Sequence, residues 1–95
     1  MAEFILFMHG DATGPQGDWD AYLKGLRASG RFQGGSSIGD GVCVRKTGVA
    51  PPTSDQITGF IRVEADSLEH ARAFLGGNPV YEAGGTVEIR ELPKG

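Results

Sequence analysis

The residues with the clearest chemistry stand near the start of the chain, in the stretch FILFMHGD that runs from Phe4 to Asp11. Five apolar residues are followed by His9 and, two positions later, by Asp11. Histidine gains and loses a proton near neutral pH more readily than other side chains, and a neighbouring carboxylate can orient its ring. We therefore predict that His9 and Asp11 form a proton-transfer pair at the end of a strand. The alternative is a half-buried histidine beside a turn aspartate that bonds to its own backbone.

Three arginines and one tryptophan are candidate ligand-binding residues. Arginine holds anions through a planar fork of N–H donors. The alternation of their strands predicts that Arg62 and Arg90 lie on polar sheet faces, while Arg45 stands in the segment VCVRKTG. Trp19, in the first turn of a predicted helix, could lie at the mouth of a cavity. These residues would orient a small anionic or hydroxylated molecule. The alternative is ion pairing for the arginines and core packing for Trp19.

Other features exclude several classes of function. The net charge is −3 and the nine Lys and Arg residues are scattered, so we expect no nucleic-acid partner. The five-residue apolar run is too short to cross a membrane, and no secretory signal pattern is present, which predicts a cytoplasmic protein without a membrane partner. Two histidines and the single Cys43 lack ligand spacing, so neither a metal nor another cofactor is expected. Cys43 is interpreted as a buried structural thiol.

The hydrophobic pattern predicts one domain over residues 1–95. Phe4 to Met8 should form a strand, and Asp18 should cap a helix that ends before Gly30. One face of that helix would carry Trp19, Tyr22, Leu23 and Leu26. The next segment should form two short strands joined at Gly39-Asp40-Gly41, followed by a loop over residues 47–56 that could act as a lid.

The second half of the chain predicts a strand, a helix and a strand. The strand ITGFIRVEA covers residues 57–65, and Asp66 with Glu69 forms a capping box for the next helix. The buried stripe of that helix would be Leu68, Ala71 and Leu75. Asn78-Pro79 could cap one further helical turn, and Thr86 to Leu92 would form the closing strand.

This order of elements predicts an α+β, ferredoxin-like βαββαβ domain with an antiparallel sheet and both helices on one face. Two helices leave the other sheet face uncovered, although Ile5, Phe7, Phe60 and Leu92 would project from it. An exposed apolar face of this kind usually has a partner. We therefore predict a homodimer through the sheet face.

The whole chain resembles the YCII-related group, and its DGPF branch in particular. The resemblance is carried by FILFMHGD, ASGRFQGG, VCVRKTG, GFIRVEADSLEHARAF, NPVYEAGG and VEIREL, in that order. It implies a ferredoxin-like domain that pairs as a dimeric α/β barrel, and it adds weight to Arg45 as a site residue. The chain departs from the branch in two places. VAPPTSD stands where the branch has Asp-Gly-Pro-Phe, and the first helix lacks the histidine of the family's Asp–His dyad.

Two classes of function remain open. In the first, the dimer binds or transforms a small polar organic molecule, as members of the dimeric-barrel superfamily do in isomerase, dehydrochlorinase and monooxygenase reactions. In the second, the protein is a non-catalytic interaction or regulatory module linked to transcription control, because DGPF-type domains also occur beside transcription-factor genes. A polar cavity that contains His9 would favour the first class. A filled barrel with an exposed apolar patch elsewhere would favour the second.

Overall fold

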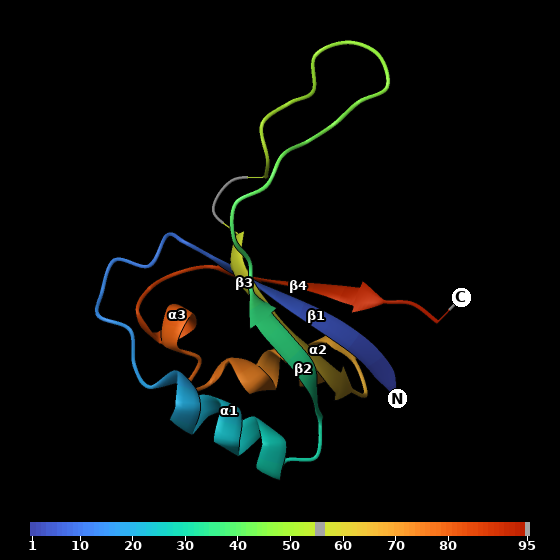
Figure 1. Cartoon of the computed structure of the whole chain (residues 1–95). Helices are drawn as coiled ribbons and strands as arrows, with labels where there is room; N and C mark the ends of the chain where they lie inside the picture. Colours follow the sequence, from blue (N-terminus) through green and yellow to red (C-terminus); the bar gives the residue numbers. More distant parts are fainter. Residues whose placement is uncertain (55–56, 95) are drawn as a thin grey trace.

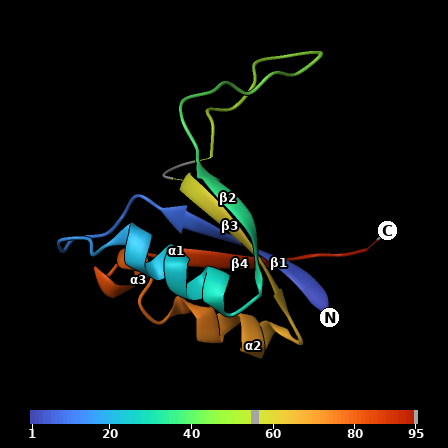
Figure 2. The ribbon, with the colours of Figure 1, turned by 60° about the horizontal axis from the view of Figure 1, so that its bottom comes forward.

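The computed structural model describes residues 1–54 and 57–94 (Figure 1). Its elements, in chain order, are β1 Ala2–His9, α1 Trp19–Ala28, β2 Phe32–Ser37, β3 Ile57–Ala65, α2 Leu68–Arg72, the 3-10 helix η1 Ala73–Leu75, α3 Pro79–Glu82 and β4 Val87–Leu92. The four strands form one sheet in the order β2-β3-β1-β4, and every neighbouring pair is antiparallel. The helices lie on one face of the sheet (Figure 2). The predicted α+β, ferredoxin-like fold is confirmed.

The core lies between the helices and the near face of the sheet. Alternate residues of β1 and β3 point into it, because successive side chains of a strand face opposite sides. α1 adds Tyr22 and Leu26, and the Tyr22 hydroxyl donates to the backbone oxygen of Phe74 at 2.7 Å. Burial raises the pKa of the Tyr22 phenol. The buried apolar residues are Phe4, Leu6, Met8, Tyr22, Leu26, Ile61, Val63, Ala65, Ala71, Val80 and Ala83.

The ends of α1 and α3 agree with the sequence, whereas α2 differs. Asp18 caps α1, accepting a hydrogen bond from the Ala21 N–H at 3.2 Å. At α2 the predicted cap Asp66 is wrong, because Ser67 accepts from the His70 N–H at 3.1 Å. Leu68, the first residue of α2, is 52% exposed instead of joining the buried stripe.

The hairpin predicted around Gly39-Asp40-Gly41 is also wrong. The last ladder bond of this segment runs from the Ile38 N–H to the Thr58 carbonyl at 2.9 Å, and residues 38–54, all of them described, then leave the sheet as an extended arm (Figure 1). Pro51 and Pro52 in the returning limb lack the N–H groups that a ladder needs. Cys43 is consequently half-buried in the arm rather than in a strand. The predicted lid loop ends at positions 55 and 56, which lie outside the described residues.

The far face of the sheet, turned away from the helices, has no cover within the single chain. Ile5 and Phe7 of β1 lie beside Arg62 and Phe60 of β3, and all four side chains are half-buried. The prediction that β1 is apolar on both sides is therefore confirmed. This face carries both apolar and charged side chains.

Candidate functional site

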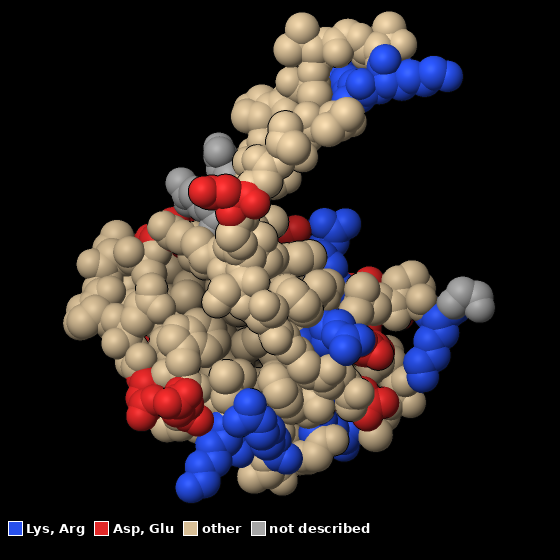
Figure 3. Space-filling model, viewed as in Figure 1, with Lys and Arg blue, Asp and Glu red and all other residues tan. Residues whose placement is uncertain are grey.

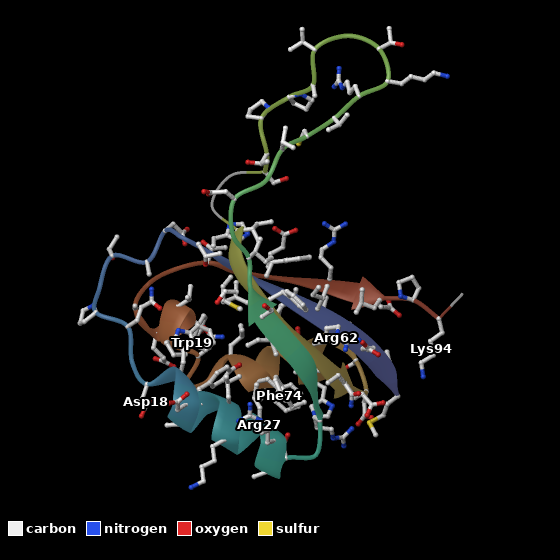
Figure 4. The ribbon with its side chains drawn as sticks, viewed as in Figure 1. Asp18, Trp19, Arg27, Arg62, Phe74 and Lys94 are labelled. Carbon is white, nitrogen blue, oxygen red and sulfur yellow. The ribbon has the colours of Figure 1, made fainter. Side chains whose placement is uncertain are left out.

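A pocket of about 430 Å³ opens between α1 and the sheet edge made by β2 and β3. Trp19, Leu23 and Arg27 line it from α1, because residues four apart in sequence stack along one side of a helix. Figure 4 shows Trp19 and Arg27 near the two ends of α1, on the side toward the sheet. The remaining lining residues are Met8, Gln16, Phe32, Gly34, Gly35, Ser36, Ser37, Thr58, Gly59, Phe60, Ile61 and Val80.

Small residues keep this pocket open. β2 reads FQGGSS, so most of the wall opposite α1 has little or no side chain. Gly59 belongs to the helix-facing row of β3, and a Cβ there would lie 3.2 Å from the Ser36 carbonyl oxygen. A Cβ on Gly35 would collide with the Phe60 carbonyl oxygen, so glycine is required where β2 approaches β3. The role of these glycines in a pocket was not predicted from the sequence.

Aromatic and polar groups share the wall of the pocket. The half-buried Trp19 indole donates from Nε1 to Oε1 of Gln16 at 3.3 Å and packs edge-on against Tyr22, with ring centroids 5.8 Å apart. Arg27 places its guanidinium carbon 5.4 Å from the centroid of the Phe32 ring. Arg27 is the charged side chain among the lining residues, and the sequence analysis missed it. The spacing 19, 23, 27 could have found it.

His9 lies on the far face, outside the residues that line the pocket. Its Nε2 atom is 3.0 Å from Oε1 of Glu88, and Oε2 of Glu88 accepts from Nη1 of Arg90 at 3.2 Å. The hydrogen bond with His9, followed by that with Arg90, lowers the pKa of the Glu88 carboxyl. The direct carboxylate partner of His9 is therefore Glu88 rather than Asp11.

Asp11 has a different partner. Its carboxylate accepts from the backbone N–H of Thr86 at 2.8 Å and from the Thr86 hydroxyl at 2.6 Å. These two bonds lower the pKa of the Asp11 carboxyl, and the nearby His9 adds a smaller effect in the same direction. Asp11 thus fastens the turn after β1 to the residue that precedes β4. The hydrogen bonds of His9 and Asp11 thus go to different partners, and the proton-transfer pair of His9 and Asp11 stays a prediction.

The three arginines predicted to bind a ligand lie apart from the pocket. Arg62 pairs with Glu3 at 2.9 Å on the far face and donates to the Gln33 carbonyl oxygen at 2.8 Å. Arg90 shares that face with Glu88, and Arg45 is exposed in the arm. The far-face arginines therefore follow the ion-pair alternative in this chain. Of the six predicted site residues, Trp19 lies in the pocket.

Two searches of the described parts of the chain complete the description. Within residues 1–54 and 57–94, no group of three or more His, Cys, Asp or Glu residues could hold a metal ion. Over the same ranges, no helix has the length and apolar character needed to cross a membrane.

Comparison with known proteins identifies a structural neighbour and a family. The chain is similar in structure to 5-chloro-2-hydroxyhydroquinone dehydrochlorinase (TftG) from Burkholderia phenoliruptrix AC1100, solved in complex with 2,5-dihydroxybenzoquinone. The TM-score is 0.52 and the identity 18%, over 98% of this chain and 95% of that one, a likeness that shows the fold alone. A search of the curated proteins finds no match. The YCII-related domain matches residues 16–93, and the chain therefore belongs to the YCII-related family.

Proposed function

We propose that this protein binds a small planar organic molecule with hydroxyl or anionic substituents in the pocket between α1 and the β2–β3 edge. The observation that carries the proposal is the combination of Trp19, Phe32 and Arg27 around a hollow of about 430 Å³. Small-molecule pockets typically measure roughly 300–1,000 Å³ and combine a mainly apolar lining with a few placed polar groups. The pocket fits that description in both size and composition.

The lining residues suggest how such a molecule would be held. Trp19 and Phe32 offer aromatic surface for a flat ring, and aromatic pairs favour offset or edge-on contact. The Arg27 guanidinium at the rim can form charge-assisted hydrogen bonds with a carboxylate or phenolate. The hydroxyl of Ser37, opposite Gly59 of the helix-facing row, adds a donor and an acceptor on the opposite wall. The quinone bound by TftG is likewise a flat ring rich in oxygen, which supports this class of ligand.

Binding is a better-supported proposal than catalysis in this pocket. Its lining contains no His, Asp, Glu, Cys or Lys among the described residues, so Arg27 is its one ionisable side chain. Arginine keeps its proton and does not act as a general base near neutral pH. Proton transfer by His9 and Asp11 would have to take place at the far face, on a molecule bound there.

We also propose a homodimer in which the far faces of two copies meet. The support is the half-buried, uncovered set of Ile5, Phe7 and Phe60, together with the dimeric α/β barrel that the resemblance to the YCII-related family implies. Such a pairing would enclose His9 and Glu88 between the two sheets and leave the α1 pocket open on the outside. Sedimentation that yields only a 10.0 kDa species at micromolar concentration would contradict the homodimer.

Titration of isotope-labelled protein by NMR tests the pocket with two defined probes. 2,5-Dihydroxybenzoquinone is the planar, anionic probe, and cyclohexanecarboxylate is a non-planar acid for comparison. We expect saturable shifts of the Trp19 indole N–H and of the Gly35 and Gly59 amides with the quinone, and weaker binding of the cyclohexane acid. Saturable shifts confined to the far face, or none, would overturn the proposal.

A pair of charge-removing variants on α1 sharpens this test. Arg27→Gln removes a charge-assisted hydrogen bond, which should weaken binding of the quinone about tenfold. Lys24→Gln, on the same helix and outside the pocket lining, is the matched control and should bind like the wild type. Equal affinity in the two variants would show that Arg27 does not hold the anion.

A further inference from the structure

The arm formed by residues 38–54 is the one large part of the described chain that packs on nothing. Val42, Val44 and Val49 are 81%, 83% and 91% exposed. The arm has two limbs: Gly48 turns its tip with a φ of 84°, and the Cys43 thiol of one limb lies 3.5 Å from the Pro52 carbonyl oxygen of the other. Both ribbon views show it projecting from the body of the molecule (Figures 1 and 2).

The single chain exposes more surface than a compact monomer of its mass. Its accessible surface is 6264 Å² for 10.0 kDa, whereas the scaling for folded monomers gives about 5,200 Å². The Cα radius of gyration is 14.7 Å, against about 12.4 Å for a compact chain of this length. The excess of about 1,000 Å² is comparable with the roughly 800 Å² that each partner buries in a stable interface.

A groove at the base of the arm connects it to the far face of the sheet. This groove has a volume of about 710 Å³, and its lining includes Phe7 of the far face with Ile38, Val42 and Ile57. Its other lining residues are Gly39, Asp40, Gly41, Thr53, Ser54 and Thr58. A partner packed on the far face would therefore meet, beside Phe7, a groove that both limbs of the arm frame. Beyond this base the arm extends away from the body of the molecule (Figure 1).

Charge also favours a second copy of this chain as the occupant. The arm, residues 38–54, carries Arg45 and Lys46 against one acidic residue, Asp40 at its base, and Figure 3 shows the basic pair near the end of the arm. The described remainder outside the arm, residues 1–37 and 57–94, contains ten Asp and Glu residues against seven Lys and Arg residues. Across a two-fold axis, the net positive arm of one copy would attract the net negative body of the other. Contact of arm with arm, or of body with body, would bring like charges together.

We propose that the arm is a dimer clasp: each copy lays the valines of its arm against the second copy, at the groove that the partner's Phe7, Ile38 and Ile57 form beside the far face. This goes beyond ligand binding in the α1 pocket and gives the far-face dimer a second set of contacts. The interface is isologous, because the same arm and the same groove meet twice.

Sedimentation equilibrium of arm variants tests the clasp. Changing Val42, Val44 and Val49 together to Ser should raise the dissociation constant of the dimer at least 100-fold, because six partly buried valine side chains are lost per dimer. The matched control changes Leu68, exposed by 52% on α2, to Ser, and should leave the constant unchanged. An unchanged constant in the triple variant overturns the clasp.

A second measurement keeps the proposal testable if the triple variant folds poorly. Protein without isotope label is spin-labelled at Cys43, the single cysteine, and is then mixed with isotope-labelled protein that carries no spin label. Relaxation enhancement between copies is expected at the Ile38 and Ile57 amides, and its absence in a proven dimer overturns the clasp. If the wild type is monomeric, the clasp and the far-face dimer both fall, whereas the α1 pocket is judged by its own titration.

Discussion

Replacing Asn78 by Ala tests how α3 is attached to the body of the molecule. Asn78 is fully buried, and its Oδ1 atom accepts from the N–H groups of Val80 and Tyr81, each at 3.0 Å. Its Nδ2 atom has no hydrogen-bond partner among the described residues. The side chain therefore stabilises the first turn of α3 through its oxygen while its nitrogen carries a cost of burial.

Three contributions determine the effect of Asn78→Ala. Loss of the cap costs about 1–2 kcal/mol, and the small cavity left behind costs about 1 kcal/mol more. Removal of an unpartnered buried amide returns about 1 kcal/mol. The net loss is about 1–2 kcal/mol, which lowers the melting temperature of a domain of this size by about 4–15 °C.

Thermal and urea unfolding followed by circular dichroism measure this loss. Asn78→Ser is the matched control, because its hydroxyl can still accept one of the two N–H groups, and it should lose about half as much. Val80 lines the α1 pocket, so the Ala variant should also weaken binding of the quinone probe. An Ala variant as stable as the wild type would refute the assignment of Asn78 as the cap that holds α3.

Two further predictions concern a close contact in the sheet and the loss of folding stability at acid pH. Gly35→Ala brings a Cβ against the Phe60 carbonyl oxygen and should lower the free energy of unfolding by about 2 kcal/mol or more. Gly39→Ala, where a Cβ would meet open space, is the control and should cost little. Urea unfolding measures both variants. The pKa values of Glu88 and Asp11 are lowered in the folded state, so their contribution to stability is present above their unfolded pKa values and is lost as pH falls through the folded ones. Glu88→Gln or Asp11→Asn should therefore lose less stability than the wild type as the pH falls from neutral to acid. A variant whose free energy of unfolding depends on pH as the wild type's does would contradict this prediction.

The fold could be predicted because its signals are local. The alternation of ITGFIRVEA gives β3 over Ile57–Ala65, and Asp18 and Gly30 mark the two ends of α1. Each of these signals lies within a few residues of the element that it defines. The arrangement of the sheet then follows from the order of elements, since short connections and a split βαβ pattern leave few alternatives.

The partners of His9 and Asp11 were harder to predict because they are distant in sequence. Glu88 reaches His9 across 79 positions, and Thr86 reaches Asp11 across 75. These partners follow from the antiparallel pairing of β1 with β4, which sequence spacing does not reveal. The short distance in sequence between His9 and Asp11 in FILFMHGD had suggested Asp11 as the carboxylate beside His9. Two residues apart at a strand end, where a turn begins, the side chains of His9 and Asp11 take different directions.

The division of α1 into two rows could have been found from helical spacing alone. Trp19, Tyr22, Leu23 and Leu26 were assigned to one face, yet Tyr22 and Leu26 are in the core while Trp19 and Leu23 are half-buried at the pocket. The rows 22, 26 and 19, 23, 27 are neighbours on the helix surface. A residue with a charged head and a long apolar stem, such as Arg27, suits the boundary between them.

The proposed homodimer would cover charged as well as apolar side chains on the far face of the sheet. Burying a charge without a partner is very costly, and removing one member of a buried pair strongly destabilises a protein. On this face Glu88 already bonds to His9 and Arg90, and Arg62 bonds to Glu3 within the single chain. A second copy that covered these groups would therefore desolvate pairs rather than single charges there, whereas the half-buried Glu64 accepts from the neutral Gln33 amide at 3.0 Å. Apolar contacts at Ile5, Phe7 and Phe60 would offset part of the total cost.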